Sequence, residues 1–191
     1  MTQSTPRTDS ARPAAAPLKA ASATETGDAG GGRLRLVVAC DHRGYEAKSR
    51  LLPELVRFGY EIVDLGCDAP ANCDYPDYAA PAARMVASGE ADAAVLLDGS
   101  GIGMGIVANK IRGIRAATAH DEITARIARE HNHCNVLCVG VDLVSDKTLA
   151  DIVGVFLTTA FAEGRHIRRV AKIAELEAEM ALPTASLKMS V

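Results

Sequence analysis

The chain has no surplus of positive charge: its 191 residues include 21 Lys and Arg against 24 Asp and Glu, a formal net charge of −3. A protein whose main partner is nucleic acid needs a basic surplus to neutralise phosphates, so that class is excluded. No apolar run approaches the roughly 20 residues that cross a bilayer, and the N-terminus has no apolar stretch typical of a secretory signal. We therefore predict a cytoplasmic protein with no membrane partner.

Paired cysteines are also missing. None of the five cysteines forms a C-x-x-C pair, which argues against a zinc ribbon and against a redox dithiol. Cys40, Cys134 and Cys138 stand in apolar runs, where a small buried thiol is the usual role of cysteine. We predict no disulfide and no metal site.

Apolar residues, by contrast, make up 48% of the chain, enough for one domain with a sizeable core. Residues 1–32 are mostly Ala, Thr, Ser, Pro and Gly, and they cannot bury enough apolar surface to offset the entropy lost on ordering. We predict one domain over residues 33–181, preceded by a disordered tail over 1–32 and followed by a frayed tail over 182–191.

Short apolar runs alternate with helix-period segments from residue 34 onward. Strands are expected at 34–40, 60–66, 92–98, 113–119 and 135–141. Helices are expected at 45–58, 78–88, 104–110, 122–130, 147–161 and 165–180. Such alternation requires crossover helices and a parallel sheet that is buried on both faces. The predicted fold class is therefore α/β, a Rossmann-like three-layer sandwich with a parallel sheet of about five strands.

A glycine-rich loop, Asp-Gly-Ser-Gly-Ile-Gly-Met-Gly over residues 98–105, follows the third expected strand. Its glycines let the backbone turn tightly and direct successive N–H groups into one concavity at a helix N-terminus. The spacing is not the G-x-G-x-x-G of dinucleotide sites, and no Gly-Lys-Ser/Thr closes a nucleotide P-loop. The loop predicts an anion hole for a phosphate or an enediolate, at the edge of the sheet where open α/β folds bind ligands.

Five blocks of sequence occur in the order seen in one family. They are ACDHRGYEAK (39–48), DYPDYA (74–79), LLDGSGIGMGIVANKIRGIRAA (96–117), REHNHCNVLCVG (129–140) and EGRHIRRV (163–170). Over residues 34–175 the chain resembles the ribose-5-phosphate isomerase B family, which also includes galactose-6-phosphate isomerase subunits and isomerases of four-carbon sugar phosphates.

The resemblance implies isomerisation of a small phosphorylated sugar through a cis-enediolate, without a metal or other cofactor. It also implies a homodimer, or a dimer of such dimers, whose active sites are shared between subunits. In that arrangement the helix at 165–180 reaches the partner subunit, and His131 enters the neighbour's site.

Positions that match the family's motifs acquire roles by the same resemblance. Asp41 and His131 would open the sugar ring, Asn132 would hold the reacting hydroxyls, and Ser100 would move a proton between the two oxygens. The loop N–H groups would stabilise the enediolate; they belong to Gly99, Gly101, Ile102 and Gly103 and extend to Gly105.

The phosphate would be held by His42, Arg165 and Arg169. Arg165 and Arg169 lie four residues apart on one helix face, where two guanidinium groups can converge on one dianion.

Two departures from the family bear on this prediction. Where the Cys-type members have a cysteine that takes the proton from carbon, this chain has Asp98, and where another subgroup has a glutamate it has Met104. A carboxylate can act as a base toward carbon, as in triosephosphate isomerase, a known example of such a glutamate. Asp98 is therefore the candidate base.

The second departure is Asp142, which stands where many members have a phosphate-binding arginine. Either Arg43 replaces the missing charge or the substrate lies differently. Ribose 5-phosphate is the default substrate, with four-carbon and six-carbon sugar phosphates as alternatives.

Two other classes of function stay open from the sequence. The loss of the usual cysteine and arginine fits a non-catalytic sugar-phosphate binding protein. Asp41, Asp98 and Asp142 each follow a strand, so they could instead hold Mg²⁺ in a phosphate-transferring enzyme.

Overall fold

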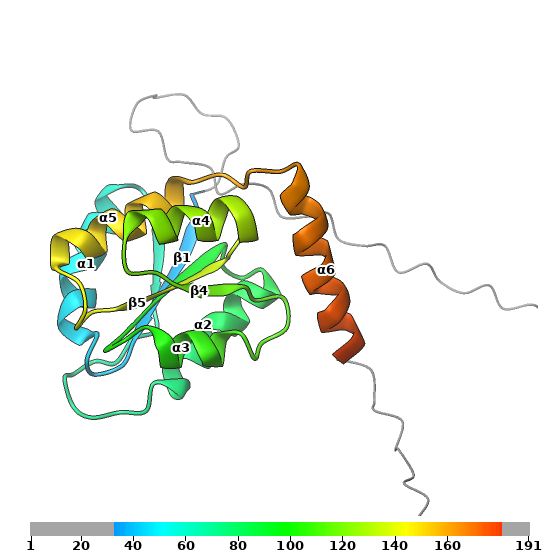
Figure 1. Cartoon of the computed structure of the whole chain (residues 1–191). Coiled ribbons are helices and arrows are strands. Elements are labelled where there is room, and N and C mark those ends of the chain that lie inside the picture. Colours follow the sequence, from blue (N-terminus) through cyan, green and yellow to red (C-terminus); the bar gives the residue numbers. More distant parts are fainter. Residues whose placement is uncertain (1–32, 181–191) are drawn as a thin grey trace, which may run out of the picture.

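The computed structural model describes residues 33–180, in which strands and helices alternate as the sequence predicts (Figure 1). The predicted N-terminal tail over 1–32 and the C-terminal tail over 182–191 lie outside the described residues. Within residues 33–180 no helix is long and apolar enough to cross a membrane. The cytoplasmic location stays a prediction.

The part of the chain that is described forms one sheet of five parallel strands in the order β2-β1-β3-β5-β4. The strands are β1 (Arg35–Cys40), β2 (Glu61–Asp64), β3 (Ala93–Asp98), β4 (Ala116–Thr118) and β5 (Val136–Gly140). The three central strands β1, β3 and β5 are buried almost throughout, which explains their near-continuous Val, Leu and Ala. The predicted α/β class and the parallel sheet are confirmed.

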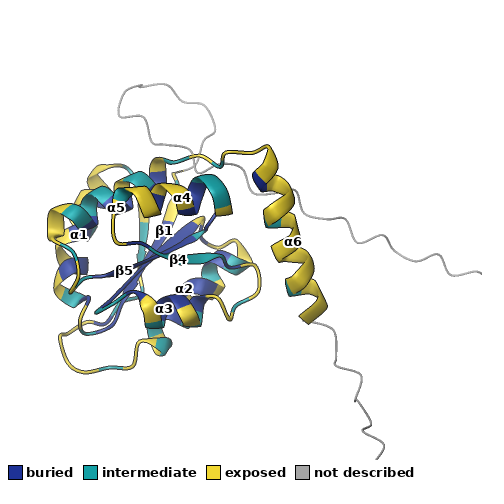
Figure 2. Cartoon of the chain, viewed as in Figure 1, coloured by how far each residue is buried: buried dark blue, intermediate teal, exposed yellow. Residues whose placement is uncertain are grey.

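Helices pack on both faces of this sheet and make the three layers. One face is covered by α1 (Tyr45–Arg57), α4 (Glu122–Asn132) and α5 (Asp146–Thr158), and the other by α2 (Pro76–Ser88) and α3 (Ile102–Ala108). The central strands and the inner sides of these helices are dark blue in Figure 2, so the core occupies two slabs, one on each face of the sheet.

Several helix ends differ from the prediction. The helix expected at 104–110 begins at Ile102, because Gly101 adopts a left-handed conformation with φ of 77° and caps it. The helix expected to end at Phe161 ends at Thr158, because Thr159 is extended. The helix expected to end at Glu130 continues to Asn132, which places His131 in its last turn.

The last helix, α6 (Arg165–Met180), has the predicted bounds and lies beside the sheet, on the side of the edge strand β4 (Figure 1). Glu177 fixes its far end by accepting a hydrogen bond from the N–H of Gly113 at 2.8 Å. Most of the helix is exposed, including Ile167 and Leu176. Its docking to a partner subunit stays a prediction.

Candidate active site

The carboxyl edge of the sheet brings the ends of β1, β3 and β5 side by side. Asp41 follows β1 and donates its N–H to the carbonyl of Leu97 at 3.2 Å, so it lies next to Asp98 at the end of β3. The chain leaves β1 toward β2 on one side and returns to β3 on the other, which is the kind of reversal where open α/β sheets bind ligands. The predicted location of the site is therefore supported by the topology.

Asp98 is buried, with 4% of its surface exposed, and its carboxylate points back into its own loop. Oδ1 accepts the N–H groups of Ser100, at 2.9 Å, and of Gly101, while Oδ2 accepts the N–H of Met104 at 3.2 Å. The N–H of Gly101 is thus already bonded to Asp98, whereas the sequence assigned it to an incoming enediolate. Three N–H groups of the loop therefore bind the carboxylate of Asp98 itself, and the predicted hole for a phosphate or an enediolate stays a prediction.

Asp41 has a similar local role at the start of α1. Its Oδ1 accepts the N–H groups of Arg43 at 2.8 Å and Gly44 at 3.2 Å. Gly44 packs so closely on β3 that an added Cβ would meet the Leu97 carbonyl oxygen. The turn that carries Asp41 and His42 is therefore fixed against the strand that carries Asp98.

His42 is half-buried beside the loop that precedes α2. Its Nδ1 accepts the N–H of Cys73 at 3.4 Å and lies 4.0 Å from the Cys73 sulfur. Because Nδ1 is used as an acceptor, the neutral ring carries its proton on Nε2, which then serves as a hydrogen-bond donor. A donor is what the predicted phosphate contact requires.

Tyr75 is a site residue that the sequence interpretation missed. Its ring lies over Gly103, where an added Cβ would sit 2.9 Å from two ring carbons. Tyr75 belongs to the block DYPDYA, but it does not directly follow a strand, and only the fold shows that this segment returns to the glycine loop. Tyr75 closes one side of the loop.

Arg43 and Asp142 form an ion pair over the other side of the loop. Arg43 donates from Nη2 at 2.7 Å and from Nε at 3.1 Å to Asp142 Oδ2. That oxygen would lie 2.9 Å from a Cβ added to Gly99, so the pair rests on the loop itself. Arg43, which the sequence offered as the replacement for the charge missing at position 142, is therefore in contact with Asp142.

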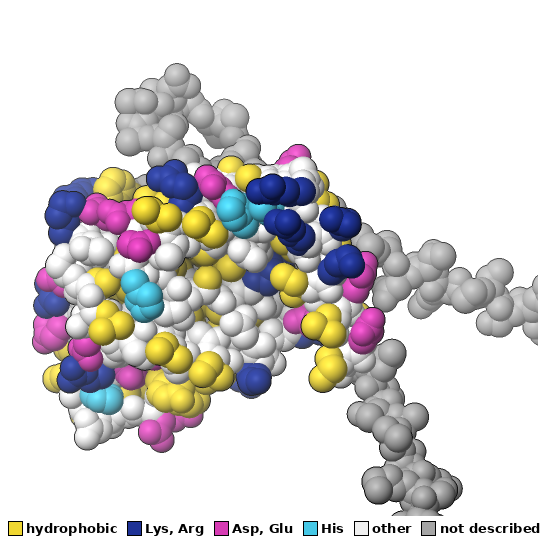
Figure 3. Space-filling model, viewed as in Figure 1, with side chains coloured by type: hydrophobic (Ala, Val, Ile, Leu, Met, Phe, Trp, Pro, Cys, Tyr) yellow, Lys and Arg dark blue, Asp and Glu magenta, His cyan; other side chains and the backbone are white. Residues whose placement is uncertain are grey.

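The remaining predicted residues lie at the opposite, amino edge of the sheet. His131 and Asn132 end α4 just before β5 begins, and Arg165 and Arg169 are exposed on the first turns of α6. Figure 3 shows Lys and Arg side chains (dark blue) gathered over this part of α6, next to exposed histidine atoms (cyan).

Within that group, His131 stacks on His166 with ring centroids 4.3 Å apart. Burial, and then the neighbouring His131, Arg165 and Arg169, lower the pKa of His166.

The two groups of predicted residues do not meet within one chain. The central strands have five or six residues, and at about 3.3 Å per residue the two edges are separated by roughly 16–20 Å. Asp41, His42, Arg43 and the glycine loop lie at one edge, and His131, Asn132, Arg165 and Arg169 lie at the other.

The three carboxylates considered as metal ligands are engaged separately: Asp41 and Asp98 accept backbone N–H groups, and Asp142 pairs with Arg43. Among residues 33–180 no group of three or more His, Cys, Asp or Glu side chains is placed to hold a metal ion. These carboxylates therefore do not form one set of ligands in this geometry.

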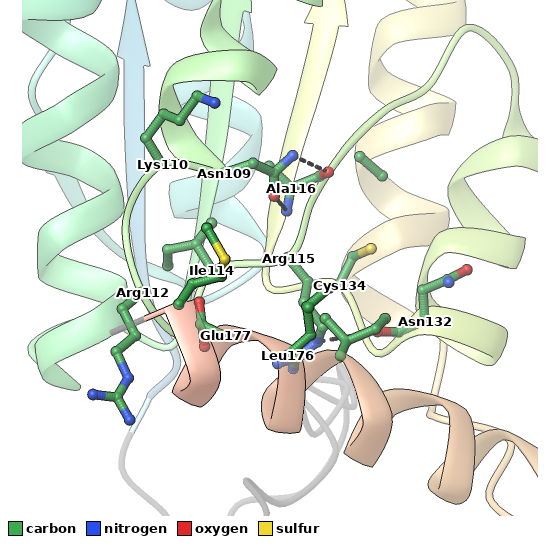
Figure 4. Close-up of a pocket in the computed structure, with 13 residues that line it drawn as sticks. Asn109, Lys110, Arg112, Ile114, Arg115, Ala116, Asn132, Cys134, Leu176 and Glu177 are labelled. Atoms are coloured by element: carbon green, nitrogen blue, oxygen red, sulfur yellow. Dashed lines mark hydrogen bonds between the residues drawn. The ribbon is translucent and has the colours of Figure 1, made fainter. Parts of the chain in front are cut away.

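A separate hollow lies between α6 and the β4 edge (Figure 4). It is lined by apolar Ile114, Ile173 and Leu176 together with polar side chains that include Arg115 and Glu177. Asn132 is the one predicted site residue in its lining, so this hollow is distinct from the site at the carboxyl edge.

His133, which ends α4 in a left-handed conformation, gives a testable pH dependence. Burial, and then the charges of Arg129 and Arg115, lower its pKa to about 4 from an ordinary value of 6.5. Below pH 6.5 the unfolded chain therefore binds a proton at this residue that the folded chain rejects, so stability falls between pH 6.5 and 4.

We expect His133→Asn, which tolerates the same backbone conformation, to remove up to about 3 kcal/mol of that fall. The measurement is the free energy of urea unfolding of both proteins at pH 7, 6, 5 and 4. Parallel curves for the two proteins would contradict the assignment.

Comparison with known proteins bears on the whole domain. Residues 36–173 match the family model described as Ribose/Galactose Isomerase. The ribose-5-phosphate isomerase B of Escherichia coli K12 is 37% identical over 143 residues, which are 75% of this chain and 96% of that protein. A sugar phosphate isomerase of Bacillus subtilis is 41% identical over 75% of this chain and 97% of that protein, and its name specifies no particular sugar.

Solved structures agree with the sequence comparison. A ribose-5-phosphate isomerase B of Clostridium thermocellum has a TM-score of 0.76 and 38% identity, covering 78% of this chain and 100% of that one. The Mycoplasma genitalium enzyme with bound ribulose 5-phosphate has a TM-score of 0.73 and 38% identity, covering 76% and 97%.

Proposed function

Because this chain belongs to the ribose/galactose isomerase family and is a sugar-phosphate isomerase, we propose that it interconverts ribose 5-phosphate and ribulose 5-phosphate through a cis-enediolate. The observation that carries the proposal is the carboxylate of Asp98, buried at the glycine loop beside Asp41. Several relatives are named ribose-5-phosphate isomerase B, which supports this sugar over those of four or six carbons.

The active site is completed by a second copy of the chain. His131, Asn132, Arg165 and Arg169 lie at the edge of the sheet opposite Asp98, so one chain cannot bring them to the same sugar. A symmetric dimer that places the amino edge of one subunit against the carboxyl edge of the other would form two active sites, each containing both groups of residues. The exposed arginines of α6 are available for such a contact.

In this site the reaction begins with opening of the sugar ring by Asp41 and the partner subunit's His131. Asp98 then removes the proton from C2 of the aldose. The electron pair of that C–H bond forms the C1–C2 double bond of the enediolate, while the π pair of the C1 carbonyl moves onto its oxygen. Ser100 transfers a proton from one oxygen to the other, and Asp98 returns its proton to C1. Atoms and charges balance without a further reactant.

Asp98 has the capacity for this step. A carboxylate oxygen has two lone pairs, and Oδ2 accepts a single long N–H bond, so one of its lone pairs is available for the carbon proton.

The decisive experiment is exchange of the C2 hydrogen in D₂O, followed by NMR, with ribose 5-phosphate and a panel of four-carbon and six-carbon sugar phosphates. We expect exchange and isomer formation, fastest with ribose 5-phosphate and unchanged by a chelator. Faster turnover of another sugar phosphate would identify that sugar as the substrate instead. Loss of activity with the chelator would favour the Mg²⁺-dependent phosphate-transferring enzyme. Binding of a sugar phosphate without any exchange across the panel would leave only a binding protein.

A further inference from the structure

The Arg43–Asp142 pair has no part in the steps above, yet it lies against Gly99 in the glycine loop of the site. The two side chains are 56% and 42% exposed. An exposed pair of this kind contributes only about 0–1 kcal/mol to stability. The contribution of the pair to stability therefore does not explain why the carboxylate of Asp142 stands where a dianionic substrate binds.

The pair is fixed in place relative to the glycine loop. Asp142 Oδ2 lies against the α-carbon of Gly99, and the aliphatic part of Arg43 approaches the same residue. Gly99 directly follows Asp98, the proposed base. A sugar whose reacting carbons lie at Asp98 must therefore pass close to the pair.

Each member of the pair has bonding capacity left over. Both bonds from Arg43 go to a single oxygen of Asp142, so Asp142 Oδ1 and Arg43 Nη1 have no partner among residues 33–180. One ion pair at the glycine loop thus keeps both an acceptor and a donor free for a ligand. A phosphate dianion offers only acceptors and would leave Asp142 Oδ1 without a donor, whereas a hydroxyl both donates and accepts.

The charges at this edge of the sheet also favour a hydroxyl over a phosphate next to Asp142. Asp41 and Asp98 are further carboxylates at the same ends of neighbouring strands, so a phosphate placed against Asp142 would meet three negative groups and one arginine. The phosphate is better accommodated by His42 and by the partner subunit's Arg165 and Arg169.

Resting on the proposed function, we propose that Arg43 and Asp142 form a hydroxyl-binding subsite. A free hydroxyl of the sugar, on a carbon between the isomerising pair and the phosphate, donates to Asp142 Oδ1 and accepts from Arg43 Nη1. The pair thereby determines specificity, because it selects sugar phosphates that carry a hydroxyl at that carbon in the orientation that reaches both groups.

The test pairs protein variants with substrate analogues. Dissociation constants from calorimetry and kcat/KM are measured for wild type and Asp142→Ala, with the most active sugar phosphate and with analogues that each lack one hydroxyl between C2 and the phosphate. We expect Asp142→Ala to weaken binding and lower kcat/KM for the parent sugar by about 10- to 100-fold. With one analogue, and only one, the variant should cause no further loss, because the group that Asp142 binds is already missing.

Asp146→Ala is the matched control. Asp146 pairs with Arg50 at 2.9 Å at similar exposure, 62% and 54%, but that pair joins α1 to α5 away from the glycine loop. We expect its kinetics to stay within about twofold of wild type, since an exposed pair alone contributes little. Arg43→Ala should lose affinity with the same analogue pattern as Asp142→Ala.

Two results would overturn the inference while leaving the isomerase intact: an active wild type with an unaffected Asp142→Ala variant, or an equal loss with every analogue, which would indicate a long-range charge effect. A wild type that neither binds nor turns over any sugar of the panel would remove the proposed function and this subsite with it.

Discussion

Replacing Asp98 with asparagine is expected to slow C2 hydrogen exchange and isomerisation by at least about a hundredfold. Asparagine has nearly the same size, and its oxygen can still accept the N–H groups of Ser100 and Gly101. The amide cannot take a proton from carbon, however, so the variant separates the chemical role from the structural one. The measurement is kcat for exchange at saturating sugar phosphate, with KM expected to change little.

The control for this variant must lose a carboxylate that caps a helix but does no chemistry. Asp121 fits, because its Oδ1 accepts the N–H of Thr124 at 2.7 Å at the start of α4. Asp121→Asn should therefore leave kcat within about twofold of wild type, because an N-cap substitution acts on stability. Urea unfolding of both variants would show whether their loss of stability is comparable.

Asp98→Cys adds a positive test, since it introduces the thiol found in the Cys-type members that the chain resembles. A thiolate can serve as a base, so this variant should retain more activity than Asp98→Asn. If Asp98→Asn turned over at the wild-type rate, the proton would have to be removed by another group, although the isomerase itself would remain.

Sequence patterns predicted the architecture well because burial dictates them. A strand covered on both faces must be apolar almost throughout, as in Ala93–Leu97. Three such strands and two less buried edge strands, separated by helical segments, allow few other folds. Helix ends were less predictable because they depend on single backbone conformations. Gly101 adopts a positive φ, so α3 begins two residues earlier than predicted. The loop contains several glycines, and the sequence does not indicate which of them adopts that conformation.

The side-chain arrangement of the site depended on tertiary contacts that no local pattern contains. Arg43 and Asp142 are 99 residues apart in the chain and meet only because β1 and β5 both flank β3. The orientation of Asp98 toward its own loop also follows from the turn that the glycines make. Residue types at strand ends could thus be named in advance, while their pairing could not.

A hybrid dimer should recover activity that both of its parents lack. One parent is Asp98→Asn, which is defective at the carboxyl edge. The other carries Arg165→Ala and Arg169→Ala, which remove the two proposed charged contacts to the phosphate at the amino edge, for an expected loss of about 100-fold or more. Within residues 33–180 neither arginine forms an ion pair, so their truncation should not disturb the fold.

In the hybrid, purified through a different tag on each chain, one site combines both sets of defects and the other combines the two intact edges. We therefore expect about half of the wild-type activity per dimer, because a twofold axis generates two equivalent sites. A hybrid as inactive as its parents would mean that each site belongs to a single chain.

The reciprocal hybrid makes the same test in the opposite direction. When all three substitutions lie on one chain and its partner is wild type, a shared arrangement gives each site one defective edge, so the dimer should be nearly inactive. Sites contained within single chains would instead leave the wild-type partner working and the dimer half active. Because the two hybrids contain the same substitutions in the same numbers, differences in stability or expression cannot produce opposite activities, and only the way the two edges are shared between chains can.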